Sequence, residues 1–241
     1  MKDIERRIEW RFRKALRDYR LIEDGDHVLV ALSGGKDSLL LLELLARRSR
    51  VFMPRFSVSA VHVRMENIGY RTDTTCLQQF CDELGIKLHI VTTCFETRQT
   101  SQSPGSDAWR KQKTPCFLCS WYRRKEIFNL AQQLGCSKIA LGHHQDDIIH
   151  TALMNLTYEG RFEGMQPKLK LDRMPLIIIR PLALEHESDI RAYAESRKYP
   201  KLIKLCPYEH DTRRTSIAHL FSEMERLNPE ARYSCWHALG F

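Results

Sequence analysis

Residues 33–38 combine the backbone freedom and the charges that a phosphate-binding turn requires. They are Ser33, Gly34, Gly35, Lys36, Asp37 and Ser38. Gly34 and Gly35 have no Cβ, so the backbone can approach a ligand and direct several N–H groups into one concavity. Lys36 adds a positive charge, and Asp37 fits such a turn when a Mg²⁺ lies between its carboxylate and the bound phosphates. The pattern predicts a nucleotide-phosphate site.

The segments on either side place this turn between a strand and a helix. The apolar run 28–32 is typical of a buried parallel strand, and the leucines at 39–42 are strong helix formers. The turn is not a Walker A loop, because Asp37 follows the lysine and Val30 stands where a glycine is required. The alternative is an ordinary tight turn rich in small residues.

A second motif, residues 142–147, also joins an apolar run to an expected helix start. It reads Gly142, His143, His144, Gln145, Asp146 and Asp147. Two adjacent carboxylates at this point suit Mg²⁺ bound to pyrophosphate. One of them could instead serve only to cap the helix.

Three of the eight cysteines form a third candidate site. Cys116 and Cys119 make one Cys-x-x-Cys pair, and Cys206 lies later in the chain. Such a pair alone is ambiguous among zinc, redox and iron–sulfur roles. Zinc usually needs a second pair, whereas three thiolates can hold a [4Fe–4S] cluster with one iron open. The other five are expected as small core residues: Cys76, Cys81, Cys94, Cys136 and Cys235.

The remaining pattern predicts an α/β fold with a doubly wound parallel sheet of about five strands. Strands are expected at 27–32, 56–63, 86–92, 137–142 and 176–184. Helices are expected at 3–22, 39–45, 73–84, 120–134, 148–158, 188–198 with Ser188 as N-cap, and 215–227, before a short tail. Residues 94–114 and 159–175 are expected as loops. Ligands of such sheets bind at the carboxyl ends of the strands, where the end of the second strand at 62–65 would line the pocket.

Composition narrows the class of protein. The chain has 241 residues and a net charge of +8, so an anionic partner is expected. No apolar stretch approaches 18 residues and the first residues lack a signal-peptide core, which predicts no membrane span and a cytoplasmic location. We expect a basic N-terminal helix at 1–22, a nucleotide domain at 23–200 and a C-terminal extension at 201–241. The basic helix face is either simply solvated or in contact with RNA phosphates.

The motifs together resemble the tRNA 2-thiocytidine synthetases, a family of PP-loop N-type ATP pyrophosphatases (adenine nucleotide alpha hydrolase-like fold) that act on cytidine 32 of tRNA. The matching words are SGGKDS, PCFLC, LGCSKIALGHHQDDIIHT, MQPKL and IIIRPLA. The resemblance covers roughly residues 10 to 215.

The resemblance implies that ATP adenylates the C2 oxygen of cytosine, forming AMP and pyrophosphate, and that sulfur then replaces the oxygen. It implies phosphate contacts by residues 33–38 and Gly142, Mg²⁺ held by Asp37, Asp146 and Asp147, and catalytic roles for Lys36, Asp37, Cys116 and Cys119. Cys116, Cys119 and Cys206 would hold a [4Fe–4S] cluster through which sulfur is delivered. A cysteine desulfurase as sulfur donor and a homodimer are also implied.

Two other interpretations stay open. A related PP-loop enzyme would thiolate uridine or attach lysine to cytidine in tRNA. A non-catalytic iron–sulfur or nucleotide sensor that contacts RNA would bind ATP without converting it to AMP.

Overall fold

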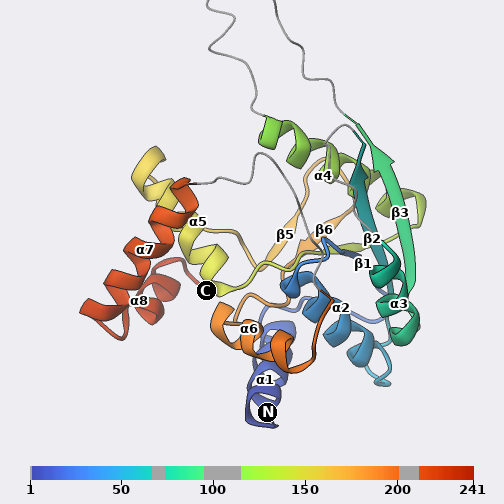
Figure 1. Ribbon diagram of the computed structural model, residues 1–241, viewed down its shortest axis with the longest axis horizontal. Coiled ribbons are helices and arrows are strands. Elements are labelled where there is room, and N and C mark those ends of the chain that lie inside the picture. Colours follow the sequence, from blue (N-terminus) through green and yellow to red (C-terminus); the bar gives the residue numbers. More distant parts are fainter. Residues whose placement is uncertain (1, 67–73, 95–114, 201–211) are drawn as a thin grey trace, which may run out of the picture.

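The structure, a computed structural model, describes residues 2–66, 74–94, 115–200 and 212–241. Its centre is a six-stranded sheet in the order β3-β2-β1-β4-β6-β5 (Figure 1). The strands are β1 (His27–Ala31), β2 (Ser57–Met65), β3 (Lys87–Thr93), β4 (Lys138–Ala140), β5 (Lys168–Lys170) and β6 (Ile177–Ile179). All neighbours pair in parallel except β5, which pairs antiparallel with β6 at the edge. The predicted doubly wound α/β fold is confirmed.

The sixth strand corrects the expected loop at 159–175. In β5, Leu169 pairs opposite Ile178 of β6, and the two other residues of β5 are lysines. A three-residue edge strand with two charges has no apolar run that sequence reasoning could detect. Lysines are common on edge strands, where they discourage pairing with other chains.

Eight helices lie in the described part of the chain. They are α1 (Lys2–Asp18), α2 (Lys36–Ser49), α3 (Thr75–Leu84), α4 (Pro115–Gln133), α5 (Gln145–Glu159), α6 (Glu187–Ser196), α7 (Thr212–Leu227) and α8 (Ala231–Ala238). None of them is both long and apolar enough to cross a membrane.

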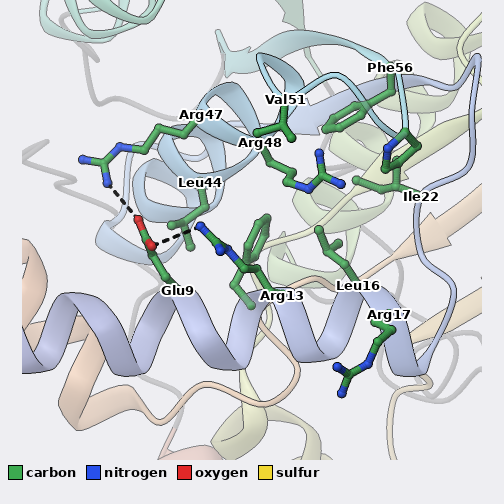
Figure 2. Close-up of a pocket in the computed structure, with 12 residues that line it drawn as sticks. Glu9, Arg13, Leu16, Arg17, Ile22, Leu44, Arg47, Arg48, Val51 and Phe56 are labelled. Atoms are coloured by element: carbon green, nitrogen blue, oxygen red, sulfur yellow. Dashed lines mark hydrogen bonds and ion pairs between the residues drawn. The ribbon is translucent and has the colours of Figure 1, made fainter.

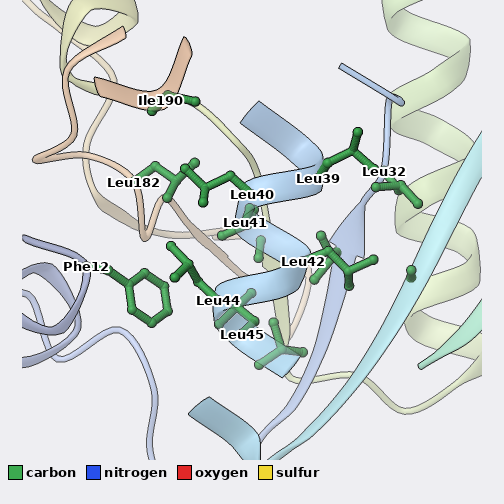
Figure 3. Packing of buried hydrophobic residues seen from close by; sticks show 14 of the residues in the cluster. Phe12, Leu32, Leu39, Leu40, Leu41, Leu42, Leu44, Leu45, Leu182 and Ile190 are labelled. Carbon is green, nitrogen blue, oxygen red and sulfur yellow. The ribbon is translucent and has the colours of Figure 1, made fainter. Parts of the chain in front are cut away.

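The alternation of side chains along β1 distributes the helices over both faces of the sheet. Val28 and Val30 belong to the core that contains α2, with helices α1, α3 and α6 around it. Leu29 points to the opposite face and belongs to the core beneath α4. Figure 3 shows the buried leucines of α2 packed between Leu32, Phe12 and the chain around α6. Helices α5, α7 and α8 form a third core beside the sheet.

Several helix boundaries differ from the expectation. Helix α4 begins at Pro115, five residues earlier than predicted, so the Cys-x-x-Cys pair lies within the helix, near its start. Helix α6 has His186 as its N-cap, which makes the prediction for Ser188 wrong. The expected C-terminal tail contains α8, whose short amphipathic pattern buries Cys235 and Trp236.

The basic residues of α1 are largely engaged within the protein. Arg7 and Arg11 both bind the carboxylate of Asp189 on α6, at 2.8 and 2.5 Å. Lys14 pairs with Asp18 within the same helix. The two pairs with Asp189 hold α1 against α6. Because these ion pairs engage much of the basic charge of α1, they favour the alternative without RNA contact.

A cavity of about 480 Å³ lies between α1, the end of α2 and the chain that enters β2 (Figure 2). It is at the edge of the sheet where the strands begin. Two of its arginines, Arg13 and Arg47, pair with Glu9 at its rim. The residues with predicted chemistry lie at the other edge, where the strands end.

Candidate functional site

The two phosphate motifs meet at the carboxyl edge of the sheet. One follows β1 and the other follows β4, which are neighbouring strands. A Cβ on Gly142 would lie only 3.1 Å from the backbone carbon of Asp37 and from the nitrogen of Ser38. The backbones of the two loops are therefore in direct contact, and only a glycine leaves the room for this.

The glycine turn holds its shape through its own serines. Ser38 Oγ donates to the carbonyl of Gly35 at 2.9 Å, and Ser33 Oγ lies 3.1 Å from Ser38 Oγ. Gly34 has φ of +80°, a conformation that favours glycine. The N-cap of α2 is Gly35, which has no side chain to accept from the first-turn N–H groups. That helix start can therefore receive an anion.

Charged side chains surround this helix start. Lys36 Nζ lies 3.1 Å from Asp37 Oδ1 and 3.4 Å from Glu187 Oε1. The buried ring of His144 lies 4.0 Å from Asp37 Oδ1 and 3.4 Å from Asp147 Oδ2. Burial alone would lower the pKa of His144, but the surrounding carboxylates outweigh it and leave the pKa raised.

The two adjacent acids of the second motif have different surroundings. Asp146 Oδ1 accepts from Arg232 Nη2 at 2.8 Å, and its Oδ2 accepts from the backbone N–H of Glu187 at 2.9 Å. Burial would raise the pKa of Asp146, but its contacts with His144 and Arg232 hold it well below the usual range. Asp146 thus ties α5 to α6 and α8, whereas Asp147 is only partly buried.

The fit for Mg²⁺ is correspondingly uneven. Asp37 Oδ1 is buried without a hydrogen bond, and both Asp37 and Asp147 lie beside His144. Asp146 would have to give up Arg232 to bind a metal. Within the described part of the chain, no three His, Cys, Asp or Glu side chains are arranged to hold a metal ion. Asp37 and Asp147 therefore fit Mg²⁺ only as carboxylates that share it with bound phosphates, which is its common mode.

The Cys-x-x-Cys pair reaches the same edge of the sheet. Cys119 packs with Leu118 and Tyr122 of α4 against Met65, the last residue of β2. Cys116 is exposed, and neither Cys116 nor Cys119 is in a disulfide. Two thiols three residues apart near the start of one helix fit two ligands of an iron–sulfur cluster. The predicted third ligand, Cys206, lies outside the described residues.

The other cysteines mostly confirm the prediction that they are core residues. Burial raises the pKa of Cys81 to about 12 and of Cys136 to about 11, so both stay protonated and unreactive. Cys235 is buried and Cys76 is partly buried. Cys94 is exposed at the end of β3, which makes the prediction wrong for that residue.

Sequence reasoning missed two side chains that shape the site, Glu187 and Arg232. Glu187 follows β6, so the rule that ligands bind at carboxyl ends of strands could have found it. Arg232 comes from α8, which carries no motif. His62 on β2 is buried, and its Nδ1 lies 2.8 Å from the carbonyl oxygen of Leu32.

Comparison with known proteins gives the chain a family. Residues 4–200 match the model of the PP-loop domain. The chain is 35% identical over 237 residues to the tRNA-cytidine(32) 2-sulfurtransferase of Pseudomonas putida (strain GB-1), covering 98% of this chain and 84% of that protein. It is 36% identical over 238 residues to the enzyme of the same name from Bordetella avium, covering 98% and 73%.

Among solved structures, the chain is similar to the U34-tRNA thiolase NcsA from Methanococcus maripaludis with its [4Fe-4S] cluster. The TM-score is 0.74 at 25% sequence identity, covering 98% of this chain and 78% of that one. The sequence identity, the coverage and the match to the PP-loop domain together show that the chain belongs to the tRNA-cytidine(32) 2-sulfurtransferase family of PP-loop proteins.

Proposed function

We propose that this protein is a tRNA sulfurtransferase that uses ATP to replace the C2 oxygen of cytidine 32 with sulfur. Family membership supports tRNA thiolation by a PP-loop enzyme. The observation that carries the proposal is the direct contact between the glycine turn and Gly142, on the sheet edge where Cys116 and Cys119 also lie. The proposed nucleotide site and the two thiols would thus share one edge of the sheet.

The chain's own groups would bind and orient ATP. The N–H groups at the start of α2 and the backbone of the glycine turn would hold its phosphates, with Lys36 beside them. Asp37 and Asp147 would hold Mg²⁺ together with the phosphates, and the ion would neutralise part of their charge. The C2 oxygen of cytosine would attack the α-phosphorus and expel pyrophosphate. A sulfur nucleophile would then add to C2 and expel AMP, which carries away the original oxygen.

Cys116 and Cys119 would bind two irons of a [4Fe–4S] cluster, with Cys206 as the proposed third ligand. When bound, the cluster would offer an open iron to inorganic sulfur. A cysteine desulfurase as the source of that sulfur and a homodimer as the working assembly are further parts of the proposal.

Thiolation of uridine is the second candidate. The solved structure that the chain resembles is named a U34-tRNA thiolase, although at 25% identity against 35% for the cytidine-specific relatives. The modified nucleoside itself distinguishes the two.

The test is thiolation by protein reconstituted anaerobically, with ATP, Mg²⁺, a cysteine desulfurase and unmodified tRNA transcripts. We expect 2-thiocytidine by mass spectrometry of nucleosides, and none from a transcript with adenosine at position 32. Lys36→Ala should slow AMP formation about 100-fold, by analogy with the loss of one electrostatic group. Lys170→Ala, which removes an exposed lysine on β5, should have no effect. Product as 2-thiouridine would support the second candidate, and no AMP from the wild type would refute both.

A further inference from the structure

Arg180 is a buried positive charge that the proposed chemistry has not used. It directly follows β6, and only 6% of the residue is exposed. Its Nη1 donates to the carbonyl of Gln166, and its backbone N–H donates to the carbonyl of Pro167 at 2.8 Å. Its Nε is buried without a hydrogen-bond partner. The guanidinium is therefore held firmly by one nitrogen while another donor is left open.

The charge of Arg180 is also uncompensated. Burial lowers its pKa to about 10, and in the described parts of the chain no charge of a carboxylate opposes this shift. A buried arginine normally has an acidic partner, because leaving its charge alone in the protein interior is costly. The open position points to an anion that arrives from outside.

His143 follows the strand next to β6 and is near enough to this arginine to feel its charge. It comes at the end of β4, which pairs with β6 so that Ala140 is opposite Ile179. Its Nδ1 is likewise buried without a hydrogen-bond partner. Burial and the charges of Arg180 and Arg214 lower the pKa of His143 to about 4, against the opposing charge of Asp147, so the ring is neutral at neutral pH. A neutral ring can donate one hydrogen bond without adding a second positive charge.

We propose that Arg180 and His143 bind a phosphate group of a substrate, on the β6 side of the glycine turn. The inference rests on the proposed function, because both proposed substrates, ATP and tRNA, carry phosphates. The planar guanidinium fork suits phosphate oxygens, and it binds them most strongly where water is excluded. Arg180 follows β6, which is two strands from β1 and its glycine turn, and His143 follows β4, the strand between them. Either the far phosphates of ATP or a backbone phosphate of tRNA would reach it.

The test compares Arg180→Gln and Arg180→Lys with Arg173→Gln, a control that removes an exposed arginine from the loop before β6. Binding of inorganic pyrophosphate and of ATP is measured by calorimetry, and binding of a tRNA transcript by filter retention. We expect Arg180→Gln to weaken one of these at least tenfold, and Arg180→Lys to weaken it less because it keeps the charge. Loss of pyrophosphate and ATP binding identifies the phosphate as the nucleotide's, and loss of tRNA binding alone identifies it as the tRNA's.

Thermal unfolding without ligand separates this role from a structural one. Glutamine keeps a donor for the Gln166 carbonyl and removes the uncompensated charge, so Arg180→Gln should melt no lower than the wild type. Unchanged binding in every arm, or weaker binding together with a lower melting temperature in both variants, would overturn the inference. Ligand binding and melting temperature are measured without thiolation, so they test this phosphate site independently of the proposed reaction.

Discussion

Glu43 and Glu185 are both buried glutamates, but their surroundings are opposite. Glu43, in the middle of α2, accepts from Tyr193 Oη at 3.1 Å and from Tyr199 Oη at 2.5 Å. Arg197 and Arg47 add ion pairs at 3.1 and 2.5 Å. Glu185, in the loop after β6, has no hydrogen bond to either side-chain oxygen, and its ion-pair partner Arg11 is 3.8 Å away.

The two glutamates represent two kinds of buried charge: one is fully paired and joins helices of the fold, and the other has no hydrogen-bond partner. The Glu43 cluster joins α2 to α6, and every oxygen has a donor. At the carboxyl edge, His143 Nδ1 and Arg180 Nε are buried without a hydrogen-bond partner. The cavity between α1 and α2 has charges of both kinds on its wall. Arg47 pairs with Glu9 (Figure 2) and with Glu43, whereas Arg48 Nη1 is buried without a hydrogen bond. Unpaired buried atoms are therefore a stronger sign of a ligand site where they lie at the carboxyl ends of the strands, because ligands of such sheets bind there.

Removing Glu43 should have the largest effect. Glu43→Ala leaves Arg47 and Arg197 without their shared buried partner and both tyrosine hydroxyls without an acceptor. We expect a loss of roughly 3–5 kcal/mol in the free energy of unfolding, the usual cost of breaking a buried pair. Urea denaturation measures it, with Glu195→Ala, an exposed acid on α6, as control. A loss equal to that of the control would mean that the cluster is not what joins the two helices.

Replacing Glu185 should raise the free energy of unfolding, and by less than replacing Glu43 lowers it. Burial raises the pKa of Glu185 to about 8, against the opposing charge of Arg11. The unfolded chain releases this proton near pH 4.5 and the folded chain near pH 8, so the wild type loses stability as pH rises between these values. Glu185→Gln removes that loss.

The gain in unfolding free energy from Glu185→Gln should therefore grow with pH. Each pH unit contributes at most about 1.4 kcal/mol, so we expect roughly 2 kcal/mol between pH 5 and pH 7. Urea denaturation at several pH values measures the difference from the wild type, and Glu195→Gln should show none. A gain that does not change with pH would show that Glu185 is as well paired as Glu43.

The sequence alone predicts those features of the two regions that depend on residue type, on sequence period or on the order of the strands. The run of leucines after Gly35 and the alternation in β1 follow from residue type and period, and the meeting of the two phosphate motifs follows from parallel topology. Ion pairs between segments that are distant in the sequence cannot be predicted in this way. Nothing near Glu43 indicates Tyr199, and nothing near Asp146 indicates Arg232, because such pairs form only once α6 and α8 have docked.

The smallest expected effect tests the contact on which the nucleotide site depends. In Gly142→Ala, the new methyl would lie 3.1 Å from the backbone of Asp37 and Ser38, so the two loops must separate by a few tenths of an ångström. Overpacking of this kind costs at least about 1 kcal/mol, and we expect calorimetry to show an affinity for ATP that is about tenfold weaker.

Gly164→Ala is the matched control, since its methyl would crowd Ile148 at the same 3.1 Å but away from the glycine turn. It should lower the melting temperature and leave ATP affinity within about twofold, because overpacking there strains only the third core. Equal effects of both substitutions on ATP affinity would mean that this contact does not shape the phosphate site.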